Sequence, residues 1–161
     1  MPLPSGRRSA QANAPAGPSS VLLASTGVPF TAEEIRQSAL LAGPSPVTVL
    51  SIARLHGSSL GLPNPGLMPT RREREQQRDI VATAISALER GDRQVDGQVV
   101  ITRNPAKSIA RAALRLQVQH VVVAAPLQSP LRRLVEGDPV AGIRRRVGSA
   151  ATVIGRQNRV R

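Results

Sequence analysis

Residues 120–125, His-Val-Val-Val-Ala-Ala, form the stretch that decides the fold. A short run with no polar residue after its first position is typical of a strand buried on both faces of a sheet. Two similar runs precede it, Val-Leu-Leu-Ala-Ser at 21–25 and Val-Thr-Val-Leu-Ser-Ile at 47–52. Strands of this kind occur in parallel sheets that are covered by helices, so the three runs predict an α/β fold.

Segments with helical periodicity separate the strand-like runs. Thr31 stands three residues before Glu34, the spacing of a capping box, and Gly43 follows the helix that this spacing predicts. The other predicted elements are a helix at 71–90, a strand at 95–102, a helix after Asn104-Pro105, a helix after Asp138-Pro139 and a strand at 150–154. Because strands that alternate with helices form parallel sheets, the sequence predicts a three-layer α/β/α sandwich around a five-stranded parallel sheet.

The chain divides into one domain and two tails. Residues 1–20 are rich in proline and nearly free of bulky apolar side chains, which predicts a disordered tail. The domain spans 21–157, and residues 158–161 form a short basic tail. The segment from His56 to Thr70 is rich in glycine and proline and has the composition of a loop.

Composition excludes several classes of protein. The 161 residues contain no cysteine and only two histidines, which excludes disulfides, thiolate metal sites and a histidine-based metal cage. No apolar run approaches the roughly 20 residues that span a bilayer, and no apolar stretch follows Arg7 and Arg8 as a secretory signal requires. We therefore expect a cytoplasmic protein that binds no metal and no membrane.

No catalytic constellation stands out in the sequence. Ser25, Thr26 and His56 could gather near strand ends, but no carboxylate is placed to orient His56 as a catalytic triad needs. His120 begins a strand and is interpreted as a structural residue at the rim of the sheet. Glu33-Glu34 is interpreted as part of a solvated helix face and not as an acid/base pair. We therefore expect no enzymatic activity.

The sequence is strongly basic, with 22 Lys and Arg against 10 Asp and Glu and a formal net charge of +12. The arginines cluster at Arg71/Arg72/Arg74/Arg78, Arg132/Arg133, Arg144-Arg145-Arg146 and Arg156/Arg159/Arg161. Such a field attracts phosphate polymers or acidic proteins, although many basic proteins bind neither. Since Phe30 is the only aromatic residue, base stacking has no platform. Any binding of nucleic acid would therefore be weakly sequence-specific and steeply dependent on salt.

Four short motifs follow one another along the domain. They are Thr26-Gly27 after the first strand, Arg103-Asn104-Pro105 followed by Ile109 and Ala112-Ala113, the strand His120-Val121-Val122-Val123, and Gly137-Asp138-Pro139-Val140. In the universal stress protein family the corresponding motifs are Asp-Gly, Gly-x-Pro followed by an Ile and small residues, Asp-Leu-Ile-Val, and Gly-Ser-Val. From Val21 to about Gln157 the chain therefore resembles a divergent member of that family.

The resemblance implies a strand order of 3-2-1-4-5, as in adenine nucleotide alpha hydrolase-like folds, and a homodimer that pairs through the last strand. The residues of that strand are Ala150, Ala151, Thr152, Val153 and Ile154. An apolar strand at the edge of a sheet needs cover, which makes the dimer physically reasonable. The alternative is that the C-terminal arginines protect the edge and that the chain is monomeric.

In open parallel sheets, ligands bind beyond the carboxyl ends of the strands, at the point where the strand order reverses. Here that crevice lies between the first and fourth strands, and its expected lining is Thr26, Gly27, Ala125 to Gln128 and Gly137-Asp138. The resemblance implies a nucleotide site at this place, because nucleotide-binding members of the family carry G-x2-G-x9-G-[ST] there. The glycines of such a motif let backbone N–H groups approach phosphates.

The chain departs from this motif at most of its positions. Ala125 and Gln128 replace the first two glycines, the loop at 129–136 is one residue shorter, and Asp138 follows the retained Gly137 in place of Ser or Thr. Side chains at these positions obstruct the approach of a ligand to the backbone, and a carboxylate repels phosphate. We therefore expect no bound cofactor and no ATP binding in the manner of the family.

Three functions remain open at this point. The first is a non-catalytic protein of the stress response that acts through dimerisation and partner binding. The second is a basic protein that binds nucleic acid, ribosomes or an acidic protein through its arginine clusters. The third is an adenine-nucleotide-binding member with a modified loop, in which Arg132 and Arg133 supply the anion contacts. The alternative for these two arginines is that water solvates them.

Overall fold

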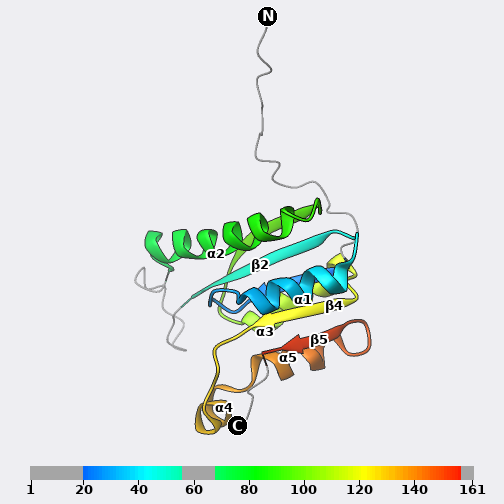
Figure 1. Ribbon diagram of the computed structural model, residues 1–161. Coiled ribbons are helices and arrows are strands. Elements are labelled where there is room, and N and C mark those ends of the chain that lie inside the picture. Colours follow the sequence, from blue (N-terminus) through cyan, green and yellow to red (C-terminus); the bar gives the residue numbers. More distant parts are fainter. Residues whose placement is uncertain (1–19, 56–67, 157–161) are drawn as a thin grey trace, which may run out of the picture.

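The computed structural model describes residues 20–55 and 68–156 of the chain. The predicted tails, apart from Ser20, and the loop residue His56 lie outside the described residues. The elements are β1 Val21–Ser25, α1 Ala32–Ala42, β2 Val47–Arg54, α2 Arg71–Glu89, β3 Val95–Thr102, α3 Pro105–Leu116, β4 His120–Ala124, α4 Pro130–Glu136, α5 Pro139–Val147 and β5 Thr152–Gly155. Strands and helices alternate up to β4, and two helices stand between β4 and β5 (Figure 1).

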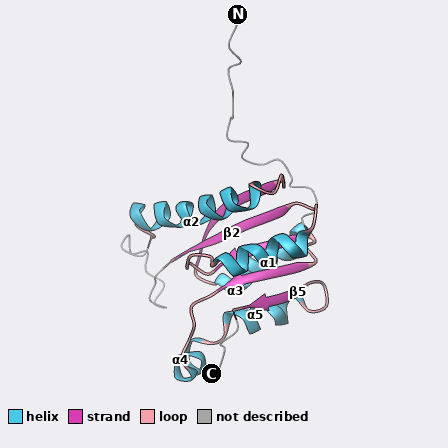
Figure 2. Ribbon diagram, viewed as in Figure 1, coloured by secondary structure: helices cyan, strands magenta, loops and turns pink. Residues whose placement is uncertain are grey.

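The five strands form one parallel sheet in the order β3-β2-β1-β4-β5, which confirms the predicted fold class and the order implied by the resemblance. In the register of the central pair, Val21 lies beside His120 and Ser25 lies beside Ala124. Because the strands run parallel, their carboxyl ends meet at one edge of the sheet (Figure 2). At this edge β1 has β2 on one side and β4 on the other, so the reversal of strand order falls between β1 and β4.

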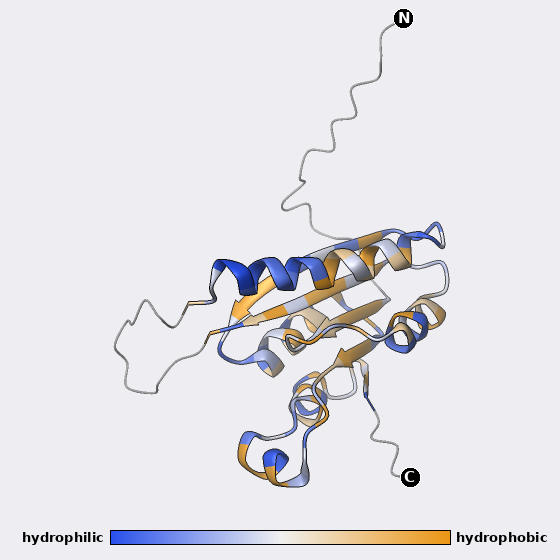
Figure 3. Cartoon of the chain, turned by 60° about the vertical axis from the view of Figure 1, so that its left-hand side comes forward, coloured by the Kyte–Doolittle hydropathy of each residue, from blue (hydrophilic) through white to orange (hydrophobic). Residues whose placement is uncertain are grey.

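Two apolar cores, one on each face of the sheet, hold the three layers together. Side chains of α1 and α2 pack on one face, against strand residues that include Val21, Leu23 and Val49. Side chains of α3 and α5 pack on the other, against residues that include Leu22 and Val121. Successive residues of a strand point to opposite faces, which is why the unbroken apolar runs serve both cores. Figure 3 shows these hydrophobic residues concentrated on the strands.

Helix caps form where the sequence spacing predicts them. The Thr31 hydroxyl accepts from the Glu34 N–H, and the Glu34 carboxylate accepts from the Thr31 N–H, which completes a capping box. Asn104 caps α3, and Asp138 caps α5. Each of these two caps is followed by a proline in the first turn of the helix, where the missing N–H of proline costs no hydrogen bond.

Two predicted boundaries are wrong. The last strand begins at Thr152 and not at Ala150, because the Ala150 N–H bonds to the Val147 carbonyl at the end of α5, and pairing beside β4 starts only at Thr152. The predicted loop at 129–136 contains α4, whose cap is the Ser129 hydroxyl. The cap-and-proline signal that predicted α3 and α5 is also present at Ser129-Pro130.

Candidate functional site

The loop after β1 folds back on the end of its own strand. The Ser25 hydroxyl accepts from the N–H groups of Gly27 at 3.0 Å and Val28 at 2.9 Å, and donates to the Val28 carbonyl. The Thr26 hydroxyl donates to the Ala124 carbonyl of β4 at 3.3 Å. Both hydroxyls are buried and hydrogen-bonded to the backbone, so they stabilise the turn that follows β1.

A second polar network fixes Gly27, and its central residue, Gln77, is one that the sequence did not single out. Gln77 of α2 donates from Nε2 to the Gly27 carbonyl at 3.2 Å and accepts at Oε1 from the Ser51 hydroxyl at 2.5 Å. Gly27 has φ +115°, and a Cβ at this position would lie 3.3 Å from the Ile52 carbonyl oxygen. The turn therefore requires glycine, and its backbone is held from β2 and α2.

Two neighbouring cavities occupy the carboxyl edge of the sheet instead of one continuous crevice. The first, of about 310 Å³, lies over β4 and β5 and is lined by Ala125, Pro126, Leu127, Gln128, Arg133, Asp138, Pro139, Val140, Arg144, Val153, Ile154, Gly155 and Arg156. The second, of about 280 Å³, lies over β1 and β2 and is lined by Thr26, Gly27, Val28, Ile52, Ala53, Arg54, Pro69, Glu73, Gln76, Gln77, Pro126, Gln128, Arg132 and Glu136. Pro126 and Gln128 line both cavities, so the residues predicted to line one crevice are divided between two.

Side chains of the chain itself cap the helix N-termini beside the first cavity. The Asp138 carboxylate accepts from the Val140 N–H at 2.9 Å and therefore occupies the N-terminus of α5, a position that favours negative charge. The Ser129 hydroxyl accepts from the Arg132 N–H at 3.3 Å at the start of α4. Gly137, with φ +77°, joins the two helices through a bend that disfavours other residues.

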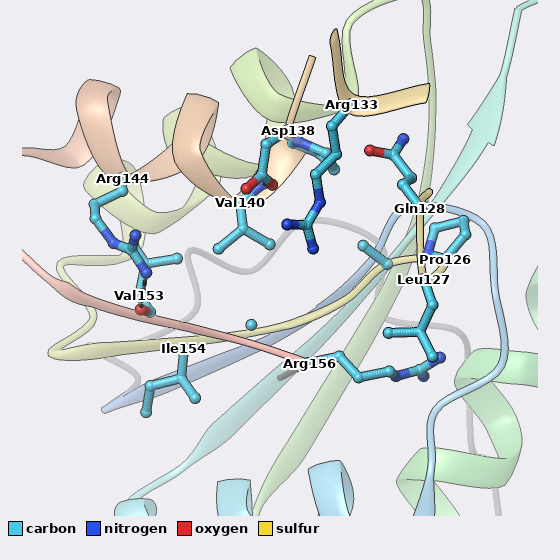
Figure 4. A pocket seen from close by; sticks show the side chains of 13 residues that line it. Pro126, Leu127, Gln128, Arg133, Asp138, Val140, Arg144, Val153, Ile154 and Arg156 are labelled. Atoms are coloured by element: carbon cyan, nitrogen blue, oxygen red, sulfur yellow. Dashed lines mark hydrogen bonds between the residues drawn. The ribbon is translucent and has the colours of Figure 1, made fainter. Parts of the chain in front are cut away.

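The arginines of this region have different environments. Arg132 pairs with Glu136 at 3.1 Å on the exposed surface of α4 and lines the second cavity. Arg133 extends its guanidinium into the first cavity, between Asp138 and Gln128 (Figure 4). The two arginines predicted as anion contacts therefore line different cavities.

The cluster at 144–146 is partly engaged within the fold. Arg144 donates to the Val153 carbonyl of β5 at 3.3 Å, and Arg146 donates to the Gly142 carbonyl of its own helix at 3.0 Å. As expected for three consecutive helical residues, their side chains do not share one direction. The cluster thus forms a less uniform basic surface than the sequence indicates.

A largely buried ion pair, which sequence analysis did not predict, crosses the carboxyl edge. Arg156, which follows β5, donates to both carboxylate oxygens of Glu34 at 2.9 and 3.1 Å. The Glu34 side chain is only 7% exposed, so the interpretation of Glu34 as a solvated residue is wrong, whereas Glu33 is exposed and pairs with Arg36. The two partners are 122 residues apart, and only the capping box hinted that Glu34 turns inward.

Residues 20–55 and 68–156 contain neither a cluster of metal-binding side chains nor a helix that could span a membrane. Within these residues, no three His, Asp or Glu side chains are grouped as a metal site would require. No helix in the same part of the chain is both long and apolar enough to cross a bilayer. His120 begins β4, at the end of the strand opposite to the cavities, as its structural interpretation requires.

Comparisons with known proteins agree with the fold. No family model and no curated protein sequence matches the chain. Among solved structures, a protein of the universal stress protein family from Burkholderia pseudomallei superposes with a TM-score of 0.58 at 15% identity, over 88% of this chain and 98% of the other. A universal stress protein from Archaeoglobus fulgidus in complex with dAMP superposes with a TM-score of 0.54 at 13% identity, over 85% of this chain and 96% of the other. A universal stress protein family protein from Arabidopsis thaliana with AMP bound superposes with a TM-score of 0.55 at 10% identity, over 86% of this chain and 92% of the other. The chain therefore has the fold of the universal stress proteins.

Proposed function

We propose that this chain is a non-catalytic cytoplasmic protein of the universal stress type, which acts through dimerisation and partner binding and does not bind ATP in the manner of the family. The observation that carries the proposal is the Asp138 carboxylate at the N-terminus of α5. It accepts the N–H that a phosphate oxygen would need, and it adds a negative charge at the same place. A polyphosphate would have to displace this cap and then lie beside a carboxylate.

The side chains at the two lost glycine positions support the same conclusion. Ala125 is 6% exposed at the end of β4, and the Gln128 side chain lies in the wall shared by the two cavities. Backbone N–H groups at these positions are therefore not presented as the bare surface that a glycine-rich loop offers to phosphates. Ligand pockets range upward from about 300 Å³. The first cavity, of about 310 Å³, is at the small end of this range, and the second, of about 280 Å³, is just below it.

The absence of catalysis is proposed from the chemistry of the carboxyl edge. Ser25, Thr26 and Gln77 are the buried polar side chains nearest to the cavities, and each is hydrogen-bonded to the backbone. Over the described ranges 20–55 and 68–156, neither cavity is lined by a histidine, cysteine or lysine. Among the residues that the structure describes, Thr26 is the one hydroxyl side chain in these two linings, and its hydroxyl donates to the Ala124 carbonyl and to no base, which is the arrangement expected of a structural residue.

Dimerisation is proposed through β5, which pairs with β4 on one side and forms an edge of the sheet on the other. Val153 and Ile154 give this edge an apolar character, and exposed strands of that kind tend to pair with other chains. The interacting residues are then Thr152 to Gly155, with Ala150 and Ala151 in the turn that precedes the strand.

Isothermal titration of the purified full-length protein with ATP, and separately with AMP, tests the proposal. We expect no heat of binding at micromolar protein concentration with either ligand. Micromolar affinity for ATP would overturn the argument from Asp138. Affinity for AMP alone would show that the base and ribose still find a site while the phosphate cap remains in place.

The alternative of a nucleotide-binding member with a modified loop has one observation in its favour, the Arg133 guanidinium inside the first cavity. It requires the parent protein to bind AMP and the Arg133→Ala variant to lose that affinity by at least tenfold. Arg145→Ala is the matched control, because Arg145 is an exposed arginine of the adjacent helix outside both cavity linings. If the parent binds no nucleotide, this alternative fails.

A further inference from the structure

Helix α4 has an exposed apolar surface that its own chain does not cover. Leu131, Leu134 and Val135 are 77%, 84% and 83% exposed, and Leu127, just before the helix, is 57% exposed. Positions 131, 134 and 135 share one side of a helix. These four residues are half of the large hydrophobic side chains exposed in the described part of the chain, the others being Leu40, Met68, Ile101 and Leu114. We call the four residues of this segment the α4 patch.

The patch is unusual because α4 buries none of its residues. A helix of seven residues is well below the length of about 12 at which isolated helices become even marginally stable in water. Helices in proteins are stabilised mainly by packing an apolar face on something else. Among the described residues, none covers the apolar face of α4.

The position of α4 indicates which molecule provides that surface. In Figures 1 and 3, α4 projects past β5, on the side of β5 that faces away from β4. This is the direction in which a second sheet would continue from the free edge of β5. Helix α4 and the edge strand β5 therefore lie at the same side of the sheet.

The small size of β5 also favours a second copy of the chain as the partner of the α4 patch. A stable interface buries about 800 Å² on each partner and takes about 20–30 residues from each side. Strand β5 has four residues, so strand pairing alone supplies only a small part of this area. Any dimer that forms at this edge needs additional surface, and the α4 patch is exposed apolar surface on the helix that projects beyond this edge.

Charge gives no reason to assign the patch to an acidic partner instead. Arg132 is paired with Glu136 on the same helix at 3.1 Å, and Arg133 is directed into the first cavity. The arginines of α4 thus leave the patch without a free cationic rim. An apolar surface of this kind suits an apolar surface of similar character, which a second copy of the same chain presents.

From these observations we infer that α4 is a dimerisation arm, which packs the α4 patch on a second copy of the chain across the β5 edge. The inference rests on the proposed dimer and adds to it that the arm, and not the strand alone, supplies the affinity. Residues of the arm also line both cavities, through Arg133 in the first and Arg132 in the second. The second copy would therefore lie beside the crevice.

Sedimentation equilibrium of the parent and of the Leu131→Ser/Leu134→Ser variant tests the arm. We expect a dimeric parent and a dimer dissociation constant raised at least tenfold in the variant, with the same far-ultraviolet circular dichroism. Leu40→Ser is the matched control, because Leu40 is a leucine of α1 that is 76% exposed and lies outside the patch. Its dissociation constant is expected to equal that of the parent.

The absence of cysteine allows a second readout that keeps the apolar patch intact. A nitroxide attached to Glu136→Cys, at the end of α4, should be immobilised at concentrations where the dimer forms and become mobile on dilution. The same label on Leu40→Cys should be mobile at every concentration. A dimeric parent with an unchanged patch variant and a mobile label would overturn the arm but leave the dimer of the proposed function standing. A parent that is monomeric throughout would overturn both.

Discussion

The two sides of the carboxyl edge, one following β1 and the other following β4, are built in opposite ways. After β1, the backbone at 26–28 is held by the hydroxyl of Ser25 and the amide of Gln77, both buried. After β4, every residue from 129 to 138 is exposed. Both segments occupy equivalent positions, at the ends of adjacent parallel strands. The difference shows that the β1 side is part of the folded core, whereas the β4 side is a surface that can take on a new role without loss of the fold.

The largest expected effect is on the free energy of unfolding, and it compares a core residue of β1 with a residue of α4. Leu22→Ala should lower the free energy of unfolding by about 2–5 kcal/mol, because Leu22 is fully buried and its truncation leaves a cavity. Leu131→Ala should change it by less than about 0.5 kcal/mol, because Leu131 makes no buried contact. Urea denaturation at a concentration where the protein is monomeric measures both values. Equal losses would mean that α4 belongs to the core and would remove the contrast.

The next effect concerns the ion pair that ties β5 to α1. Arg156→Ala should cost about 1–3 kcal/mol of unfolding free energy, since it leaves the buried Glu34 carboxylate without its charged partner. Arg36→Ala removes a similar pair on the exposed face of α1 and should cost less than about 0.5 kcal/mol. The same urea titration compares them. If both losses are small, water replaces Arg156 and the two sides of the edge are not coupled by this pair.

The fold could be predicted from the sequence because its signals are local. Unbroken apolar runs at 21–24 and 121–125 predict buried parallel strands, and the cap at Asp138-Pro139 predicts the start of α5. Each signal depends on residues within one element and survives without knowledge of the tertiary structure. The strand order came from the resemblance, and the structure has the same order.

The site could be predicted only in part, because its decisive contacts join distant residues. The pairing of Arg156 with Glu34 and the hydrogen bond of Gln77 to Gly27 connect segments 122 and 50 residues apart, and no spacing rule indicates either. The division of the crevice depends on where Pro126 and Gln128 lie after folding. The start of β5 was misplaced because a turn hydrogen bond of Ala150 outweighs the apolar run in which it stands.

A third prediction restores the β4 side to the form of a phosphate-binding loop. In the Ala125→Gly/Gln128→Gly/Asp138→Ser variant, we expect affinity for ATP to rise at least tenfold over the parent, because the backbone becomes accessible and a negative charge is removed. Isothermal titration measures the affinity. The variant Ala125→Gly/Gln128→Gly, which keeps Asp138, is the control and should gain less. If neither variant gains affinity for ATP, the shortened loop at 129–136, and not these side chains, accounts for the lost site.

The smallest expected effect is the loss of unfolding free energy when the helix cap at Asp138 is removed. Asp138→Ala should lower the free energy of unfolding by about 1 kcal/mol, because the Val140 N–H loses its acceptor at the N-terminus of α5. Asp138→Ser keeps a capping oxygen without the charge and should lie within about 0.5 kcal/mol of the parent. Thermal or urea denaturation of the two variants resolves this difference.

A neutral result for Asp138→Ala would mean that its carboxylate does not bind the helix end in solution. The N–H groups at the start of α5 would then be open to an anion, and the absence of ATP binding would rest on Ala125 and Gln128 alone. If Asp138→Ala loses the expected unfolding free energy of about 1 kcal/mol while Asp138→Ser is as stable as the parent, the two roles of the residue are separate. The hydrogen bond would account for stability, and the charge for the exclusion of phosphate, so that exclusion could be reversed by a substitution that leaves the fold intact.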